Sequence, residues 1–376
     1  MRIEPFVMER MQSTWENQVE INLSESGVHP LRLEELAEDE AERRALLSVA
    51  LGYPQTNGTP PLRDAIAAMY PGATRDHVEV TNGGAEANFI SLWHLVEPGD
   101  EVVVMVPNYM QAWGLARAFA GASSVREWPL RQAEDARWEA DISRLEDLVT
   151  PRTKLVLVCN PNNPTGARIG SHALDAICRV AARHGAWVLS DEIYRGAELD
   201  GAGTPSLWGR YDRVIVTSGL SKAYGLPGLR IGWLVAPPGL AAALWGYHDY
   251  TTIAPGVLND RLATLALEPG RRARILERTR SILRTNYPIL REWIDRRPCA
   301  FTCAPTEAGA IAFVKYRQPV NSTVLTTELR ERHSTLIVPG DQFGLDRFLR
   351  IGFGAEEPVL REGLRRLELA LAAHEG

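Results

Sequence analysis

Two apolar runs enclose a loop rich in glycine and serine in the stretch Arg213-Val-Ile-Val-Thr-Ser-Gly-Leu-Ser-Lys-Ala-Tyr-Gly-Leu-Pro-Gly-Leu-Arg-Ile-Gly-Trp-Leu-Val235. Both runs are rich in β-branched residues, so they predict two strands. The loop between them holds Lys222, one of only three lysines among 41 basic residues. Because a lysine there would be poorly hydrated, we expect its pKa to fall and its neutral, nucleophilic form to be favoured.

The same texture extends upstream to about residue 78. Short β-branched runs alternate with helix-like stretches, which predicts βα units and a mostly parallel sheet. The runs are continuous rather than alternating in polarity, so we expect helices on both faces of the sheet. The predicted strands are residues 78–80, 101–106, 154–158, 187–190, 213–217 and 230–235.

Beyond Pro255 the pattern changes to long helical periodicity, clearest over residues 271–296. Short strands are expected at 310–314, 336–338 and 348–351, and an amphipathic helix from Glu357. This pattern predicts a smaller α+β domain beside a large α/β domain. The expected division is an N-terminal arm, 1–30, that packs with the small domain, a large domain, 31–255, and a small domain, 256–376.

Composition excludes several classes of protein. The 376 residues are 45% hydrophobic and carry a formal net charge of −6 without a run of Lys and Arg, so nucleic acid is not an expected partner. The start lacks the apolar core of a secretory signal, and charge and proline interrupt residues 229–247, so we expect a cytoplasmic protein without membrane spans. Four scattered cysteines predict no metal site.

Unusual turns follow the predicted strands, at the edge where an open α/β sheet binds its ligand. The first of these turns is Thr81-Asn-Gly-Gly-Ala-Glu-Ala87, which leads into a predicted helix. The first N–H groups of that helix suit a phosphate, but the same residues are also typical of an ordinary tight turn. The second is Asn160-Pro-Asn-Asn-Pro-Thr-Gly166, in which two prolines stiffen the backbone and three side-chain amides are available for hydrogen bonds. The alternative is an ordinary Pro/Asn turn. The third is Ser190-Asp-Glu-Ile-Tyr194, which places the carboxylate of Asp191 and the phenol of Tyr194 at the end of a strand. The alternative to a functional role is that Asp191 is an N-cap and Tyr194 packs in the core.

In order and spacing, these turns together with the Lys222 loop resemble those of the class I and II aminotransferases, which are fold-type I pyridoxal-phosphate enzymes. The resemblance covers nearly the whole chain. It implies that Lys222 carries pyridoxal 5'-phosphate as a Schiff base and that Arg230 binds the cofactor phosphate. It also implies that Asp191 pairs with the pyridine nitrogen, and that Tyr194 and Asn163 bond its phenolic oxygen.

The resemblance assigns the rest of the cofactor site as well. Tyr109 is similar to the aromatic residue that stacks on the cofactor ring, and Gly83, Gly84 and Ala85 to its phosphate cradle. Gly219 stands where most relatives carry a phosphate-binding Ser or Thr, a role that Ser218 and Ser221 could fill.

Two further matches lie outside these turns. Tyr53 resembles the tyrosine that reaches the phosphate of the neighbouring subunit, which implies a homodimer with shared active sites. Arg350, in Leu349-Arg-Ile-Gly-Phe353, resembles the arginine that holds the substrate α-carboxylate with a bidentate fork.

One segment departs from the usual aminotransferase pattern. Asn22-Leu-Ser-Glu-Ser-Gly-Val-His29 is similar to the Ser-Gly-Val-His stretch of the capreomycidine synthases, which cyclise a hydroxylated arginine. Glu25, Gly27 and His29 are therefore candidates for substrate selection. For His29, simple packing of the arm is the alternative.

Three functions follow from these observations. The first is an aminotransferase acting on an L-amino acid through an external aldimine. The second is a lyase, cyclase or oxidative deaminase of specialised metabolism, such as antibiotic biosynthesis, with an arginine-derived or S-conjugated cysteine substrate. The third, least favoured, is a regulatory module that binds the cofactor without turnover, because such modules normally come with a DNA-binding domain and the stretch before Asn22 leaves no room for one.

Overall fold

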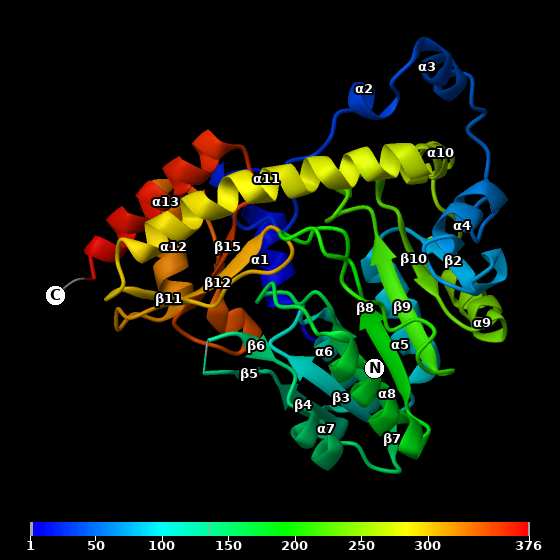
Figure 1. Ribbon diagram of the computed structural model, residues 1–376, viewed down its shortest axis with the longest axis horizontal. Coiled ribbons are helices and arrows are strands. Elements are labelled where there is room, and N and C mark those ends of the chain that lie inside the picture. Colours follow the sequence, from blue (N-terminus) through cyan, green and yellow to red (C-terminus); the bar gives the residue numbers. More distant parts are fainter. Residues whose placement is uncertain (1–2, 135, 375–376) are drawn as a thin grey trace.

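The computed structural model describes residues 3–134 and 136–374. Its main sheet has seven strands in the order β2-β10-β9-β8-β7-β3-β4, and only β10 runs antiparallel to its neighbours. The mostly parallel sheet is therefore confirmed (Figure 1). The strands are β2 (Val78–Thr81), β3 (Glu101–Val106), β4 (Val125–Pro129), β7 (Thr153–Cys159), β8 (Trp187–Asp191), β9 (Val214–Gly219) and β10 (Gly232–Val235).

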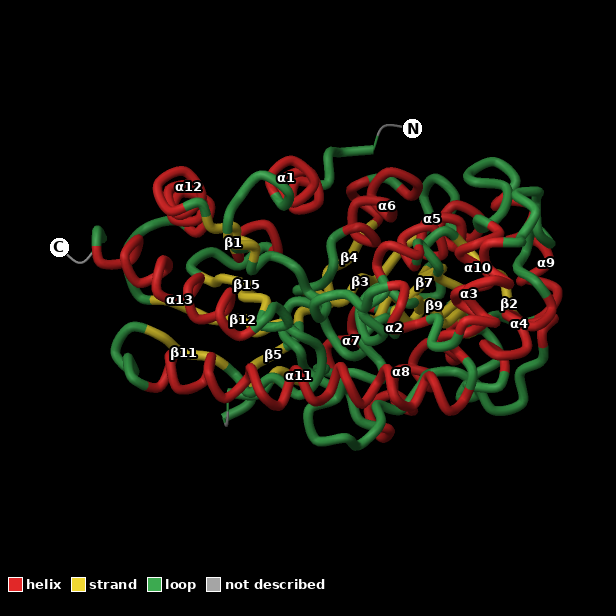
Figure 2. The backbone as a smooth tube through the Cα atoms, turned by 90° about the horizontal axis from the view of Figure 1, so that it is seen from above, coloured by secondary structure: helices red, strands yellow, loops and turns green. Residues whose placement is uncertain are grey.

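Side chains from alternate strand residues pack into two separate cores. Val102 and Val104 of β3 belong to one core, whereas Val103 and Met105 belong to the other. Helices cover both faces of the sheet, as predicted from the continuous apolar runs (Figure 2). The first core includes residues of α5 (Gly84–Leu95), α6 (Gln111–Ala120) and α9 (Pro238–His248), and the second includes residues of α8 (Ser171–His184).

A smaller antiparallel sheet follows, in the order β11-β12-β15-β14. The long helix α11 (Pro269–Asp295) runs from the large sheet to this smaller one (Figure 1). The strand expected at 336–338 is split, because β13 (Thr335–Leu336) pairs with the N-terminal segment and only β14 (Val338–Pro339) joins the small sheet. The other elements here are β11 (Phe301–Cys303), β12 (Ile311–Tyr316), α12 (Ser322–His333), β15 (Phe348–Gly352) and α13 (Glu357–Ala372).

The N-terminal segment lies directly against this smaller sheet. Helix α1 (Val7–Trp15) is followed by β1 (Ile21–Asn22), which pairs in parallel with β13. The backbone N–H of Gly352 donates to the Leu23 carbonyl at 2.7 Å. A Cβ at Gly352 would lie 2.1 Å from the Glu25 carbonyl oxygen, so only glycine allows this approach.

The remaining helices complete the large domain and the connection between the domains. Within the described ranges, none has both the length and the apolar character that crossing a membrane requires. These helices are α2 (Leu33–Leu36), α3 (Glu40–Leu47), α4 (Pro60–Ala67), α7 (Ile142–Leu148) and α10 (Val257–Leu267).

Candidate active site

A cavity opens at the carboxyl ends of β7, β8 and β9, where an open α/β sheet binds its ligands. Both the large sheet and the N-terminal segment contribute to its wall. The residues that line it and were singled out from the sequence are Glu25, Gly84, Ala85, Tyr109, Asn163, Asp191, Tyr194, Ser221, Lys222, Arg230 and Arg350.

Lys222 forms an ion pair inside this cavity. Its Nζ lies 2.6 Å from Glu25 Oε1. Burial is the largest single influence and by itself would lower the pKa of Lys222, but the charge and the hydrogen bond of Glu25, together with Tyr194, raise the pKa above its usual value. The expectation of a lowered pKa from poor hydration is therefore wrong, because the sequence did not reveal that Glu25 lies beside the lysine.

Asp191 ends β8 and presents a carboxylate without a cationic partner among the described residues. Its Oδ2 accepts from Asn88 Nδ2 at 3.1 Å, and its Oδ1 accepts from the Ile193 backbone N–H at 3.1 Å. Burial raises the pKa of Asp191, and these two neutral donors oppose the rise only in part. A cationic group brought by a ligand would complete the site.

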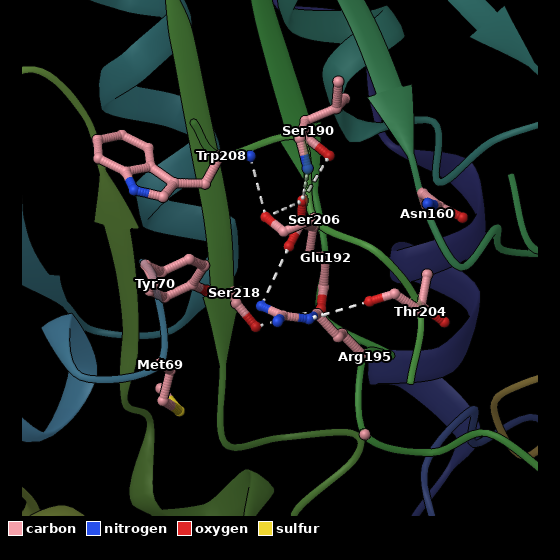
Figure 3. A network of polar contacts seen from close by, with 12 residues as sticks. Met69, Tyr70, Asn160, Ser190, Glu192, Arg195, Thr204, Ser206, Trp208 and Ser218 are labelled. Atoms are coloured by element: carbon pink, nitrogen blue, oxygen red, sulfur yellow. Dashed lines mark hydrogen bonds and ion pairs between the residues drawn. The ribbon is translucent and has the colours of Figure 1, made fainter. Parts of the chain in front are cut away.

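The neighbouring turn is held by a polar network on its other side. Glu192, the next residue, points away from the cavity and accepts from Ser190 Oγ at 3.2 Å, Ser206 Oγ at 2.9 Å and the Leu207 N–H at 2.9 Å (Figure 3). Glu192 directly follows the last residue of β8, so this network fixes the backbone that carries Asp191.

Three further predicted residues, Tyr109, Asn163 and Tyr194, line the cavity. The Tyr194 hydroxyl donates to Ser26 Oγ at 2.9 Å, and burial raises the pKa of Tyr194 to about 12. The Tyr109 hydroxyl donates to Glu9 Oε1 at 2.6 Å. Asn163 accepts at its Oδ1 from Arg350 Nη1 at 3.1 Å.

One end of the cavity is suited to an anion. Helix α5 begins at Gly84, so its free N–H groups lie at this end. The Arg230 guanidinium approaches so closely that a Cβ at Gly83 would lie 2.5 Å from Arg230 Nη2. Arg230 donates to the Pro227 carbonyl at 3.2 Å and has no carboxylate partner among the described residues.

The Ser218 backbone lies beside Gly84, but its side chain is directed away from the cavity. Its hydroxyl donates to the Glu192 carbonyl at 3.2 Å, within the network on the other side (Figure 3). Its position does not support the phosphate contact expected of it, whereas Ser221 does line the cavity. At Gly219 a Cβ would lie 2.9 Å from the Ile231 carbonyl oxygen, which accounts for glycine where relatives carry Ser or Thr.

Arg350 reaches the cavity from β15 and is almost completely buried. Its Nη2 donates to the Ser24 carbonyl at 2.6 Å, while its Nε has no hydrogen-bond partner. A buried guanidinium with unused donor capacity fits a carboxylate that arrives with a ligand. The packing of α1 and residues 23–27 against β15 holds it in this direction.

Helix α1 contributes acidic and amide side chains that the sequence did not single out. Glu9 and Gln12 of α1 and Glu16, which directly follows it, line the cavity. Burial, then the charges of Glu25 and Glu9, raise the pKa of Glu16. Their spacing of three, four and seven residues places them on one face of a helix, but nothing in that pattern reveals which surface the face covers.

Besides Gly83 and Ser218, three predicted residues do not line the cavity of their own chain. Tyr53 is 82% exposed. His29 Nδ1 lies 3.0 Å from Arg278 Nη2 on α11, which favours the packing role over contact with a substrate. Gly27 packs behind Lys222, where a Cβ would lie 3.2 Å from the Ser221 carbonyl oxygen.

A lysine, an acid without a cationic partner among the described residues and the start of a helix suited to an anion thus surround one cavity, as in an enzyme that binds a phosphorylated cofactor. The sequence model of the family "Aminotransferase class I and II" matches residues 19–367. The chain therefore belongs to the class I and II aminotransferase family, as its resemblance predicted.

Individual relatives cover nearly the whole chain. It is 34% identical to a capreomycidine synthase of Streptomyces vinaceus over 95% of this chain and 91% of the relative. It is 28% identical to an aspartate/prephenate aminotransferase of Thermus thermophilus over 88% and 86%. Among solved structures, a PLP-dependent aminotransferase from Streptococcus suis superposes with a TM-score of 0.91 at 32% identity, covering 100% of both chains. The PLP-dependent cyclase OrfR gives 0.86 at 29% identity, covering 99% and 98%.

The family identifies pyridoxal phosphate as the cofactor, which confirms the prediction. The residues that line the cavity also fit this cofactor. Asp191 lacks the cation that a protonated pyridine nitrogen supplies, and Arg230 with the start of α5 lacks an anion. Gly83 is the residue just before α5, and any residue with a Cβ at this position would clash with the Arg230 guanidinium.

Proposed function

We propose that the chain is an aminotransferase that acts on the α-amino group of an L-amino acid, with Lys222 as the residue that holds pyridoxal phosphate covalently. The observation that carries this proposal is the meeting of Lys222, the unpaired Asp191 and the buried Arg350 in one cavity. The bound cofactor supplies an electron sink for negative charge at the substrate Cα.

The protein supplies position, charge and proton transfer. Arg350 binds the substrate α-carboxylate, Asp191 keeps the pyridine nitrogen protonated, and Tyr194 with Asn163 binds the phenolic oxygen of the cofactor. Lys222 takes and returns the proton of the substrate Cα once its amine is free. Gly84, Ala85, Ser221 and Arg230 hold the phosphate.

We further propose a homodimer in which Tyr53 reaches the active site of the partner subunit. Members of the family are generally homodimers. The exposure of Leu47, Leu51 and Tyr53, at 87%, 80% and 82%, supports an interface along this part of the chain.

A second candidate function keeps the cofactor but changes the reaction. The acidic side chains Glu9 and Glu16 face the cavity beside Glu25, whereas Arg230 and Arg350 are assigned to the phosphate and the α-carboxylate. Such a lining favours a substrate with a cationic side chain. Together with the likeness to a capreomycidine synthase, this supports a lyase, cyclase or oxidative deaminase acting on an arginine-derived substrate; nothing in the lining favours an S-conjugated cysteine.

One experiment separates the two candidates. The purified protein with its cofactor is incubated with single L-amino acids, arginine included, with and without a 2-oxo acid. Transfer of the amino group to the 2-oxo acid supports an aminotransferase. Conversion of a substrate without any acceptor, with loss of ammonia, CO2 or water, contradicts it and supports the second candidate.

A further inference from the structure

A tight turn in the N-terminal segment presents the Glu25 carboxylate to Lys222. Glu25 Oε1 lies 2.6 Å from Lys222 Nζ and also accepts from the backbone N–H groups of Ser26, at 2.8 Å, and Gly27, at 2.9 Å. Two backbone donors therefore fix the carboxylate, and its position does not depend on the lysine alone.

The turn is clamped between two parts of the protein. On one side, a Cβ at Gly27 would lie 3.5 Å from Lys222 Cα, so the turn packs on the lysine loop itself. On the other side, a Cβ at Gly354 would lie 2.1 Å from the Gly27 carbonyl oxygen. Glu25 can therefore move little relative to the backbone of Lys222.

The charged and titratable groups around Lys222 come from four elements. The nearest anion is Glu25, and Glu16 at the end of α1 adds a weaker negative charge. Tyr194 at the exit of β8 also raises the pKa of Lys222, although less than Glu25 does, and burial raises the pKa of Tyr194 itself to about 12. Arg350 on β15 is a cation and acts against a charge on Lys222. Glu25 therefore provides the main stabilisation of a proton on this nitrogen.

We propose that Glu25 is the counter-ion of the Lys222 nitrogen and keeps that nitrogen protonated after it has joined the cofactor. The proposal rests on the proposed role of Lys222. The same Nζ atom forms the bond to the cofactor, so a carboxylate fixed on the backbone remains next to it. A protonated nitrogen makes the neighbouring carbon more reactive toward the amine of the substrate, so Glu25 would prepare the enzyme for substrate.

The test is a spectrophotometric pH titration of the cofactor-loaded protein, because the visible band reports the proton on this nitrogen. The variants are Glu25→Gln, which keeps the shape and removes the charge, and Glu25→Asp, which keeps the charge but shortens the side chain. Glu16→Gln is the matched control, since it removes one charge from the same cavity without touching Lys222. The melting temperature and cofactor content of each variant are measured in parallel.

We expect the midpoint of Glu25→Gln to lie about 1 to 3 pH units below that of the wild type. Glu25→Asp should fall between the two, and Glu16→Gln should stay close to the wild type. A midpoint that is unmoved in both Glu25 variants would overturn the proposal, as would an equal shift in Glu16→Gln. If Glu25→Gln does not fold, Glu25→Asp decides the matter by the same comparison. A wild type that acquires no visible band would refute the role of Lys222 itself, which separates the two failures.

Discussion

Asn88 donates from its side-chain nitrogen to Asp191 Oδ2 at 3.1 Å, while its oxygen accepts from Thr217 Oγ1 at 2.7 Å. Thr217 thereby fixes the direction of the Asn88 amide, with its N–H groups toward the acid. The arrangement stabilises the charged form of Asp191 without supplying a cation, and in the proposed function the pyridine nitrogen of the cofactor is this cation.

The charge of Asp191 should therefore serve the reaction more than it serves binding. We expect Asp191→Asn to lower kcat on the order of 100-fold, with a much smaller change in cofactor affinity. Steady-state kinetics and fluorescence titration with the cofactor measure both quantities. Asp212→Asn removes an exposed acid near the start of β9 and should change neither. Equal losses in kcat and affinity would contradict this role.

Arg350 provides a planar pair of donors that a lysine cannot imitate. Arg350→Lys should raise KM for the amino acid about 10- to 100-fold, because it loses charge-assisted hydrogen bonds worth about 1.5–3 kcal/mol. The exposed Arg347 offers a matched Arg→Lys control close by. An unchanged KM in Arg350→Lys would show that another residue binds the carboxylate.

Tyr53 tests the shared active site. Because it lies outside the cavity of its own chain, Tyr53→Phe can weaken cofactor binding only through a second subunit. We expect cofactor affinity to fall about tenfold, as for the loss of one hydrogen bond to a charged group. Tyr211→Phe, a change outside the cavity, is the control. Full affinity in Tyr53→Phe, measured on a protein shown to be dimeric by sedimentation, would refute the contact.

The ion pair of Lys222 predicts a pH dependence for cofactor uptake. Only the neutral amine attacks the cofactor, and Glu25 raises the pKa of Lys222 above its usual value, so the amine is charged throughout pH 7–9. The rate of uptake by the cofactor-free protein should therefore rise by about tenfold per pH unit in this range. Stopped-flow absorbance measures it. A rate that is flat from pH 7 to 9 would mean that the amine is already neutral.

Much of the fold could be predicted because the strands of the large sheet are continuous apolar runs followed by turns. The edge strand β4 was missed, since it reads Val-Arg-Glu-Trp-Pro and is only partly buried. The split of residues 335–339 between two sheets was missed too. It depends on pairing with β1, more than 300 residues away, which leaves no local signal.

Some of the residues that surround Lys222 could likewise be placed from the sequence, and others could not. Asp191 ends β8 and Asn163 follows β7, so their position at the sheet edge could be inferred from the sequence, whereas the role of Arg230 came from the resemblance to the family. The roles of Glu9, Asn88 and Ser26 could not be, because they arise from contacts between distant elements. Glu25 was selected for its unusual segment, but its contact with Lys222 was not foreseen, and this contact reverses the expected direction of the lysine pKa shift.

The most direct test of the account is the absorption spectrum of Lys222→Ala after incubation with pyridoxal phosphate and removal of the free cofactor. The wild type should keep a visible band that borohydride reduction fixes covalently to Lys222, as peptide mass spectrometry can verify. Lys222→Ala, folded with the same melting profile, should show neither the band nor the attached mass. A variant that keeps the wild-type spectrum and the covalent label would contradict the assignment of Lys222.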